Sequence, residues 1–104
     1  MERVLIDKFI VPEESKSAFL EAVRTSVSFL KTLPGFVEGF VYEKTDGDSP
    51  HNVMTTAVWA NEEAFTNARR SVAEEFQKRG FNPQEIMKRL KVETERAVYK
   101  RTPY

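Results

Sequence analysis

The sequence predicts a single α+β domain, residues 1–104, with four strands and two long helices in the order βαββαβ. Two long segments repeat apolar residues at helical spacing, and four short runs carry the β-branched and aromatic residues typical of strands. Proline, glycine and asparagine stand where one kind of element gives way to the next. A chain of 104 residues is long enough for one hydrophobic core, and it has no linker that would divide it.

The first strand and helix follow from residues 4–31. Residues 4–11 are rich in β-branched and aromatic side chains and stop at Pro12, so they predict a strand covered on both faces. Pro34 lacks the amide hydrogen that a helix needs, and Gly35 allows backbone angles closed to other residues, so the helix must end before them. Residues 13–31 predict that helix, because apolar side chains recur on one face: Phe19, Leu20, Val23, Val27 and Leu30.

A hairpin comes next. Residues 36–44 read as the second strand and residues 52–60 as the third, both with strand-forming residues. Residues 46–50, Asp-Gly-Asp-Ser-Pro, supply the turn chemistry between them.

The second half of the chain predicts two helices and a final strand. Residues 61–79 form the second long helix, because Asn61 can cap its first turn and Gly80 can end it. Asn82 followed by proline predicts a further short helix. Residues 91–101 are polar for a strand, which is typical of a sheet edge.

This order defines a ferredoxin-like sandwich with a four-stranded antiparallel sheet. We expect the first and third strands, the most apolar ones, to be central neighbours, and we expect the right-handed crossover to make them parallel. Two helices cover only one face of such a sheet. Because both faces of the first strand are apolar, we expect a second copy of the chain to cover the other face, which gives a homodimer.

Composition excludes several classes of function. Sixteen basic and sixteen acidic residues cancel, so binding to nucleic acid or to an anionic membrane has no electrostatic support. The absence of cysteine rules out disulfides and thiolate catalysis. The sequence shows neither the apolar core of a signal peptide nor a run long enough to span a membrane. We therefore expect a cytoplasmic protein.

Two motifs carry a resemblance to a known family. Leu-Pro-Gly-Phe at residues 33–36 and Trp-Ala-Asn-Glu-Glu-Ala-Phe at residues 59–65 resemble the antibiotic biosynthesis monooxygenase family, and the resemblance extends over nearly the whole chain. It implies a dimeric α+β barrel, in which two ferredoxin-like subunits pack sheet to sheet. It also implies several activities, among them cofactor-independent oxygenation of aromatic polyketides and quinols, haem degradation and stress-related roles. Fold analogy does not choose among them.

Three positions argue against haem degradation. Haem-degrading relatives carry an asparagine in the first strand, where this chain has Asp7, and a helical tryptophan, where it has Ala68. They also use a helical histidine as iron ligand, and residues 61–79 contain none. Many other family members have a histidine midway along this helix, where Arg69 and Arg70 stand here. We expect no cofactor.

The aromatic residues have two interpretations. Trp59 can anchor the core at the strand-to-helix junction, or it can line the substrate pocket, a role that the resemblance carries to this position. Tyr42 adds a hydroxyl that can orient a phenol or quinone oxygen. Further aromatic side chains form either plain core or the walls of a flat apolar pocket: Phe9, Phe40 and Phe65.

Two residues are candidates for proton transfer. His51 is the only histidine, and histidine is the side chain that titrates near neutral pH, but a loop histidine is often simply solvated. One histidine alone also makes no metal site, and we expect none. Asp7 and Lys8 lie midway along a central strand, so one must point beneath the helices and the other toward the second copy.

A buried charge needs a partner, which Glu93, Glu95 or Arg96 on the last strand can supply. Asp7 is therefore either one half of an interfacial salt bridge or a base in a dry pocket.

The resulting hypothesis is a cofactor-independent monooxygenase acting on a small aromatic or quinol-like molecule between sheet and helices. Trp59 and Tyr42 would position the substrate, and His51 or Asp7 would assist proton transfer. The alternative is a non-catalytic small-molecule-binding or stress-response dimeric barrel. An open pocket where Trp59, Tyr42 and an ionisable group converge favours the enzyme, whereas a pocket filled by phenylalanines favours the alternative.

Overall fold

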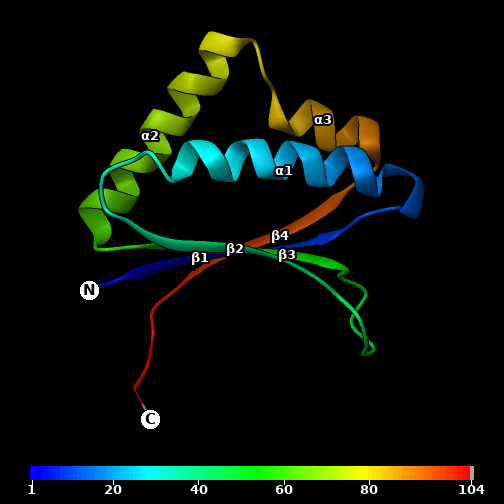
Figure 1. Cartoon of the computed structure of the whole chain (residues 1–104), viewed down its shortest axis with the longest axis horizontal. Helices are drawn as coiled ribbons and strands as arrows, with labels where there is room; N and C mark the ends of the chain where they lie inside the picture. Colours follow the sequence, from blue (N-terminus) through cyan, green and yellow to red (C-terminus); the bar gives the residue numbers. More distant parts are fainter. Residues whose placement is uncertain (104) are drawn as a thin grey trace.

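The computed structural model describes residues 1–103 and has the predicted α+β architecture. A single sheet carries all the helices on one side, and its other side has no helix over it (Figure 1). The elements are β1 (Arg3–Ile10), a 3-10 turn η1 (Glu13–Ser15), α1 (Lys16–Leu30), β2 (Phe36–Glu43), β3 (Val53–Trp59), α2 (Glu62–Arg79), α3 (Pro83–Leu90) and β4 (Glu93–Tyr99). The ferredoxin-like order is confirmed.

The sheet has the strand order β2-β3-β1-β4 and is antiparallel throughout. The predicted central position of β1 and β3 is confirmed, but the expectation that they run parallel is wrong. The right-handed crossover through α1 sets the direction of β2 relative to β1. The hairpin then reverses the chain before β3, which lies between β2 and β1 and runs antiparallel to both.

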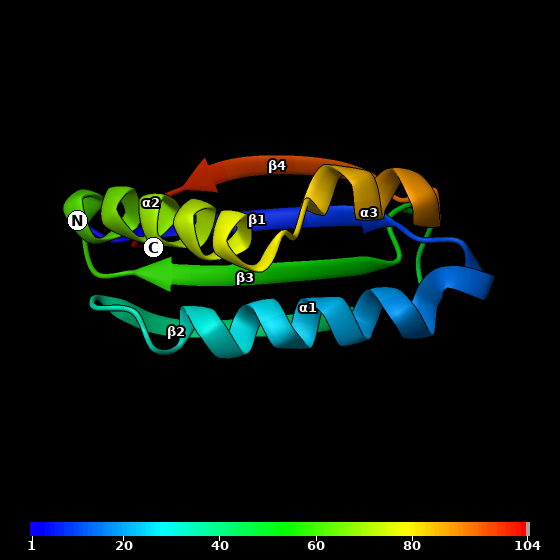
Figure 2. The same cartoon turned by 90° about the horizontal axis from the view of Figure 1, so that it is seen from above.

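The helices cover the sheet in two strips. Seen from above, α1 runs along the β2 side, while α2 and α3 follow one another along the β1 side (Figure 2). In Figure 1, α2 is inclined so that its first half lies nearer to the sheet than its second half. Accordingly, the buried residues of α2 are Phe65 and Ala68, both in that first half.

Two clusters of buried apolar side chains form the core beneath the helices. The first contains Phe9, Val11, Phe19 and Val53, with the rings of Phe9 and Phe19 edge to face at 4.8 Å between centroids. The second contains Ala57, Trp59, Phe65 and Ala68. Helices α1 and α3 pack against the first cluster, whereas α2 and the last residue of α1, Leu30, pack in the second, so both clusters hold the helical layer on the sheet.

Capping residues bound the helices where the sequence predicted. The Asn61 side chain accepts a hydrogen bond of 2.8 Å from the Ala64 amide at the start of α2. Gly80 ends this helix in the left-handed conformation, at φ +67°. The Asn82 side chain accepts bonds from the first amides of α3. These local signals explain why the boundaries of α2 and α3 were readable from the sequence.

The two motifs of the family resemblance meet in space. Gly35 has φ +82°, and its carbonyl oxygen accepts a 2.8 Å hydrogen bond from the Ala60 amide. A Cβ atom on Gly35 would lie 2.3 Å from the Cβ atom of Ala64, so only glycine fits against α2. Phe36 packs edge to face on Trp59, with 5.4 Å between ring centroids. The motifs are therefore one packed junction between the α1–β2 turn, β3 and α2.

The face of the sheet without helices is partly exposed and carries apolar side chains together with a few charged ones. We call it the open face; the alternation of β1 puts Ile6, Lys8 and Ile10 on it, opposite in direction to Phe9. Phe40, Tyr42 and Tyr99 lie on the same face by register and are 50%, 46% and 48% exposed. Large aromatic side chains exposed together mark an interaction surface.

The segment after β4 crosses one end of the open face. Arg101 pairs with Glu2 at 3.1 Å and also with Glu38, which lies on β2 at the other side of the sheet. Val58, on the open face by register, is only 4% exposed. Within residues 1–103, no helix has the length and apolar character required to cross a membrane.

Candidate functional site

A polar row crosses the middle of the sheet beneath the helices. Asp7 on β1 lies opposite Thr55 on β3 and opposite Arg96 on β4. Directly opposed residues of antiparallel strands point to the same face, and Asp7 alternates with Leu5 and Phe9, which pack into the two core clusters. The row therefore faces the helices. Asp7 is 6% exposed and is the buried charged residue of the described chain, residues 1–103.

Asp7 and Arg96 form a bidentate ion pair. The Nε atom of Arg96 donates to Asp7 Oδ1 at 2.6 Å, and Nη2 donates to Oδ2 at 3.0 Å. The hydrogen bonds that the Arg96 guanidinium donates to Asp7 raise the pKa of that guanidinium. Of the three partners that the sequence offered, the structure pairs Arg96 with Asp7, while Lys8 points to the open face opposite Glu95.

The pair is asymmetric in its access to water. The Asp7 side chain is 9% exposed and the Arg96 side chain 59% exposed. A guanidinium at the rim of a site is a fixed positive charge, and such a charge can stabilise a developing oxyanion. A carboxylate beside it, with lone pairs left over from the ion pair, can accept a proton. The row thus combines an acceptor and an anion-stabilising group.

Three predicted aromatic residues lie on the same side of the sheet as this row. Trp59, Phe65 and Phe9 are buried, at 2%, 7% and 5% exposure. Trp59 and Phe65 share the second core cluster, whereas Phe9 belongs to the first. The polar row lies between the two clusters along the strands, because position 7 of β1 falls between Leu5 and Phe9. The burial of Trp59 fits the role of core anchor, and its role as a pocket wall stays a prediction.

The expected convergence of Tyr42 with Trp59 is wrong, because these side chains lie on opposite faces of the sheet. A shift of register between Phe36 and Glu38 marks a bulge in β2. Phe36 packs on Trp59 beneath the helices, but after the bulge it is Val41 that packs into the helix-side core. Phe40 and Tyr42 consequently point to the open face.

His51 also lies apart from Asp7. Its Nε2 atom is 3.3 Å from a carboxylate oxygen of Glu95, and its Nδ1 atom is 3.5 Å from the Ser49 hydroxyl. Glu95 stands opposite Lys8 and so lies on the open face. The predicted site residues therefore divide into a helix-side group with Asp7 and an open-face group with His51. Any role for the second group belongs to that face.

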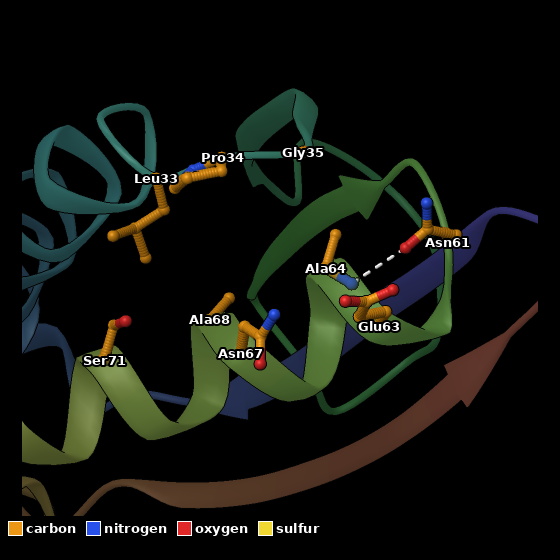
Figure 3. A pocket seen from close by; sticks show the side chains of 9 residues that line it. All are labelled: Leu33, Pro34, Gly35, Asn61, Glu63, Ala64, Asn67, Ala68 and Ser71. Atoms are coloured by element: carbon orange, nitrogen blue, oxygen red, sulfur yellow. Dashed lines mark hydrogen bonds between the residues drawn. The ribbon is translucent and has the colours of Figure 1, made fainter.

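A cleft opens between the α1–β2 turn and the first half of α2 (Figure 3). Its volume is about 360 Å³. It contains none of the site residues predicted from the sequence; it is lined by Leu33, Pro34, Gly35, Asn61, Glu63, Ala64, Asn67, Ala68 and Ser71. The signal for it in the sequence was the small side chains of α2 at helical spacing, Ala64, Ala68 and Ser71, but such residues also occur in ordinary helix packing.

The described residues, 1–103, contain no group of three or more acidic or histidine side chains placed to hold a metal ion. The polar row offers one carboxylate, Asp7, which is paired with Arg96.

The fold and the helix-side row define a small ferredoxin-like α+β protein with its polar centre between sheet and helices. The sequence profile of the family described as antibiotic biosynthesis monooxygenase matches residues 3–79, and the chain belongs to this family. No curated protein sequence gives a match.

Solved structures share the fold. A candidate monooxygenase from Shewanella loihica PV-4 superposes with a TM-score of 0.73 at 19% identity, over 99% of this chain and 96% of that chain. SnoaB, a cofactor-independent oxygenase from Streptomyces nogalater, superposes with a TM-score of 0.70 at 19% identity, over 99% of this chain and 95% of that chain. A haem-degrading protein from Mycobacterium tuberculosis superposes with a TM-score of 0.59 at 19% identity, over 66% of this chain and 78% of that chain. At such identities the likeness establishes the common fold.

Proposed function

We propose that this protein is a cofactor-independent monooxygenase that acts on a small aromatic or quinol-like substrate. The observation that carries the proposal is the Asp7–Arg96 pair, which faces the helices rather than the solvent side of the sheet. Membership of the monooxygenase family and the fold shared with SnoaB support it. The substrate ring would lie on the helix side of the sheet, at the polar row.

The reaction needs no external reductant, because the substrate supplies all four electrons. A quinol with a ring C–H bond reacts with dioxygen to give the hydroxyquinone and water, so one oxygen atom enters the ring and the other leaves as water. Deprotonation of the quinol makes it a better electron donor to dioxygen. The protein's contribution is to take up that proton, hold the anion and keep water away.

The polar row and the second core cluster have separate roles in this scheme. Asp7 accepts the hydroxyl proton, and the Arg96 guanidinium stabilises the resulting phenolate. The Thr55 hydroxyl, next to Asp7 in the row, donates a hydrogen bond to a second substrate oxygen. Trp59 and Phe65 supply the apolar surface against which the ring is held flat.

The open-face group serves a different purpose in the proposal. A second copy of the chain covers Phe40, Tyr42 and Tyr99, and the homodimer is the working form in the cytoplasm. Aromatic side chains exposed together on one face of a sheet favour burial against an identical face.

Analytical ultracentrifugation tests this dimer. The protein should sediment as a dimer, and Phe40→Glu should produce monomers because two carboxylates would be buried in the interface. Val98→Glu is the matched control: Val98 is 46% exposed, but it lies opposite Leu5 and so faces the helix side. A monomeric parent protein, or a Phe40→Glu variant that stays dimeric while folded, would contradict the proposal.

Oxygen consumption tests the chemistry. The purified protein should consume oxygen with at least one member of a panel of hydroquinones and polycyclic phenols. The Asp7→Asn variant keeps the side-chain shape but loses the proton acceptor, so its rate should fall by about 100-fold or more. Asp48→Asn, in the exposed turn between β2 and β3, should retain the rate. Equal rates in the Asp7→Asn variant would overturn the role of Asp7.

Saturable binding of a panel member without oxygen consumption would favour the alternative function, a small-molecule-binding or stress-response dimeric barrel. The packing of Phe9 on Phe19 and of Phe36 on Trp59 is the observation on its side, because these rings fill space beneath the helices.

A further inference from the structure

We propose that Ser49, His51 and Glu95 form a nucleophilic site that hydrolyses short-chain aryl esters. The Ser49 hydroxyl is 3.5 Å from Nδ1 of His51, and Nε2 of the same imidazole is 3.3 Å from a carboxylate oxygen of Glu95. A hydroxyl, an imidazole and a carboxylate linked in that order are the groups with which proteins activate a serine. The site shares no residue with the Asp7–Arg96 row, so it is a second activity, independent of the proposed oxygenase.

The fold brings these residues together from two distant parts of the chain. Ser49 and His51 belong to the connection between β2 and β3, which extends past the end of the sheet and bends toward the open face (Figure 1). Glu95 lies on β4, on the far side of β1 from β3. The His51 side chain therefore reaches across β1 on the open face to contact Glu95.

The backbone that carries His51 is held in place. The side-chain amide of the next residue, Asn52, donates to the carbonyl oxygen of Val11 and accepts from its amide, both at 2.8 Å. Pro50 lies between His51 and Ser49 and restricts the backbone that joins them. The hydroxyl and the imidazole are thus positioned before a substrate arrives, which is what nucleophilic catalysis requires.

Glu95 determines which ring nitrogen of His51 can act as the base. A carboxylate accepts hydrogen bonds, so Nε2 carries the proton and donates it to Glu95. Nδ1 is left with its lone pair, on the side where the Ser49 hydroxyl lies. The Ser49 oxygen also accepts a 3.2 Å hydrogen bond from the His51 amide, which stabilises the negative charge that develops as the hydroxyl proton leaves.

A positive charge lies beside the nucleophile. The Lys44 ammonium donates a hydrogen bond to the backbone carbonyl oxygen of Ser49. An ammonium has three N–H donors, so donors remain for the carbonyl oxygen of an ester at the Ser49 hydroxyl. A charge at this place stabilises the oxyanion that forms when the ester is attacked.

The reaction has two steps and needs no oxidant or reductant. Ser49 Oγ attacks the ester carbonyl carbon while its proton passes to His51 Nδ1. The bond to the aryl oxygen then breaks, which leaves an acyl group on Ser49 and releases the phenol with that proton. Water attacks the acyl group with His51 again as the base, so the carboxylic acid is released and the Ser49 hydroxyl is restored.

The exposure of the site defines the class of ester. Ser49 is exposed, and so is the Glu95 side chain, at 66%. An open site gives little binding energy to a long acyl chain, so short acyl groups are expected. It also gives little help to the departing group. The leaving group must therefore be a weak base, which a phenolate is and an alkoxide is not.

Hydrolysis of 4-nitrophenyl acetate, followed by the release of nitrophenolate, tests the proposal. Ser49→Ala removes the nucleophile and His51→Gln removes the base, so each should lower the rate by about tenfold or more. Glu95→Gln should lower it by about threefold, because an amide can still accept the hydrogen bond from Nε2. Ser28→Ala is the matched control: Ser28 is an exposed serine on α1, and its loss should leave the rate unchanged. Thermal melting shows whether each variant is folded.

Covalent labelling gives an independent measurement. A fluorophosphonate should modify Ser49 in the parent protein, as located by peptide mass spectrometry, and should not modify it in folded His51→Gln. A hydrolysis rate that is unchanged in Ser49→Ala would overturn the proposal, because the imidazole or a surface amine would then be the nucleophile. Failure of the fluorophosphonate to label Ser49 in the parent protein would overturn it as well.

Discussion

Replacing Gly35 by alanine should lower the free energy of unfolding by about 2 to 5 kcal/mol. Two costs add. The backbone at Gly35 is left-handed, at φ +82°, which an L side chain adopts only with strain. The new Cβ atom would also lie 2.3 Å from the Cβ atom of Ala64, so the turn must move away from α2 and loosen the junction that holds Phe36 on Trp59. Urea unfolding followed by circular dichroism measures the change.

Gly80→Ala is the matched control for this prediction. Gly80 is also left-handed, at φ +67°, but a Cβ atom there would meet no other atom within 4 Å. Only the backbone cost remains, about 1 to 2 kcal/mol. If Gly35→Ala were no more destabilising than Gly80→Ala, the close packing of the turn on α2 would not be a determinant of stability.

The two halves of the Asp7–Arg96 pair should not be equally sensitive to substitution. Arg96→Met leaves the Asp7 carboxylate, 9% exposed, without its two donors, so the free energy of unfolding should fall by about 2 to 4 kcal/mol. Asp7→Asn leaves the guanidinium of Arg96, which is 59% exposed and can be solvated, so the loss should be about 1 kcal/mol.

The double variant Asp7→Asn/Arg96→Met separates this explanation from a general loss of packing. With no buried charge left, it should be more stable than Arg96→Met alone, because removing the carboxylate removes the penalty that the first substitution created. Chemical denaturation of all four proteins completes the cycle. Equal losses of unfolding free energy in the two single variants would contradict this explanation, as would a double variant that is less stable than Arg96→Met. Either result would show that Arg96 does not act by compensating the buried charge of Asp7.

Local signals account for what the sequence predicted correctly. Asn61, Gly80 and Asn82 act on the amides or backbone angles next to them, so their effect does not depend on the rest of the fold. The apolar positions of residues 16–30 likewise follow from one helical face, although the first turn of that predicted helix is a 3-10 turn at Glu13–Ser15. The polar composition of residues 91–101 correctly identified β4 as an edge strand.

The site was harder to predict than the fold, because it depends on how distant segments of the chain are placed relative to one another. The bulge between Phe36 and Glu38 moves Phe40 and Tyr42 to the open face, and nothing in the strand's own composition shows where a bulge falls. Asp7 and Lys8 were both recognised as charges that needed partners on the last strand, and the sign of the charge already favoured Arg96 for Asp7. That Asp7, rather than Lys8, lies beneath the helices could be read only from the folded sheet.

The cleft escaped prediction for a similar reason. It depends on the distance between the turn at Leu33 and the small side chains of α2, which the contact of Gly35 with Ala64 sets. The motif that identified the family therefore contains the residues that shape the cleft. Their spacing in the sequence did not reveal that role, because the two motifs come together only in the folded chain.

The most direct measurement of the proposed activity is mass spectrometry of the product formed under ¹⁸O₂ by chelator-treated protein, with a quinol that supports oxygen consumption. A cofactor-independent monooxygenase should place one ¹⁸O atom in the hydroxyquinone, consume one dioxygen per product and release no hydrogen peroxide. Unlabelled quinone formed together with hydrogen peroxide, or activity that is lost on chelation and restored by a metal, would contradict the proposed mechanism.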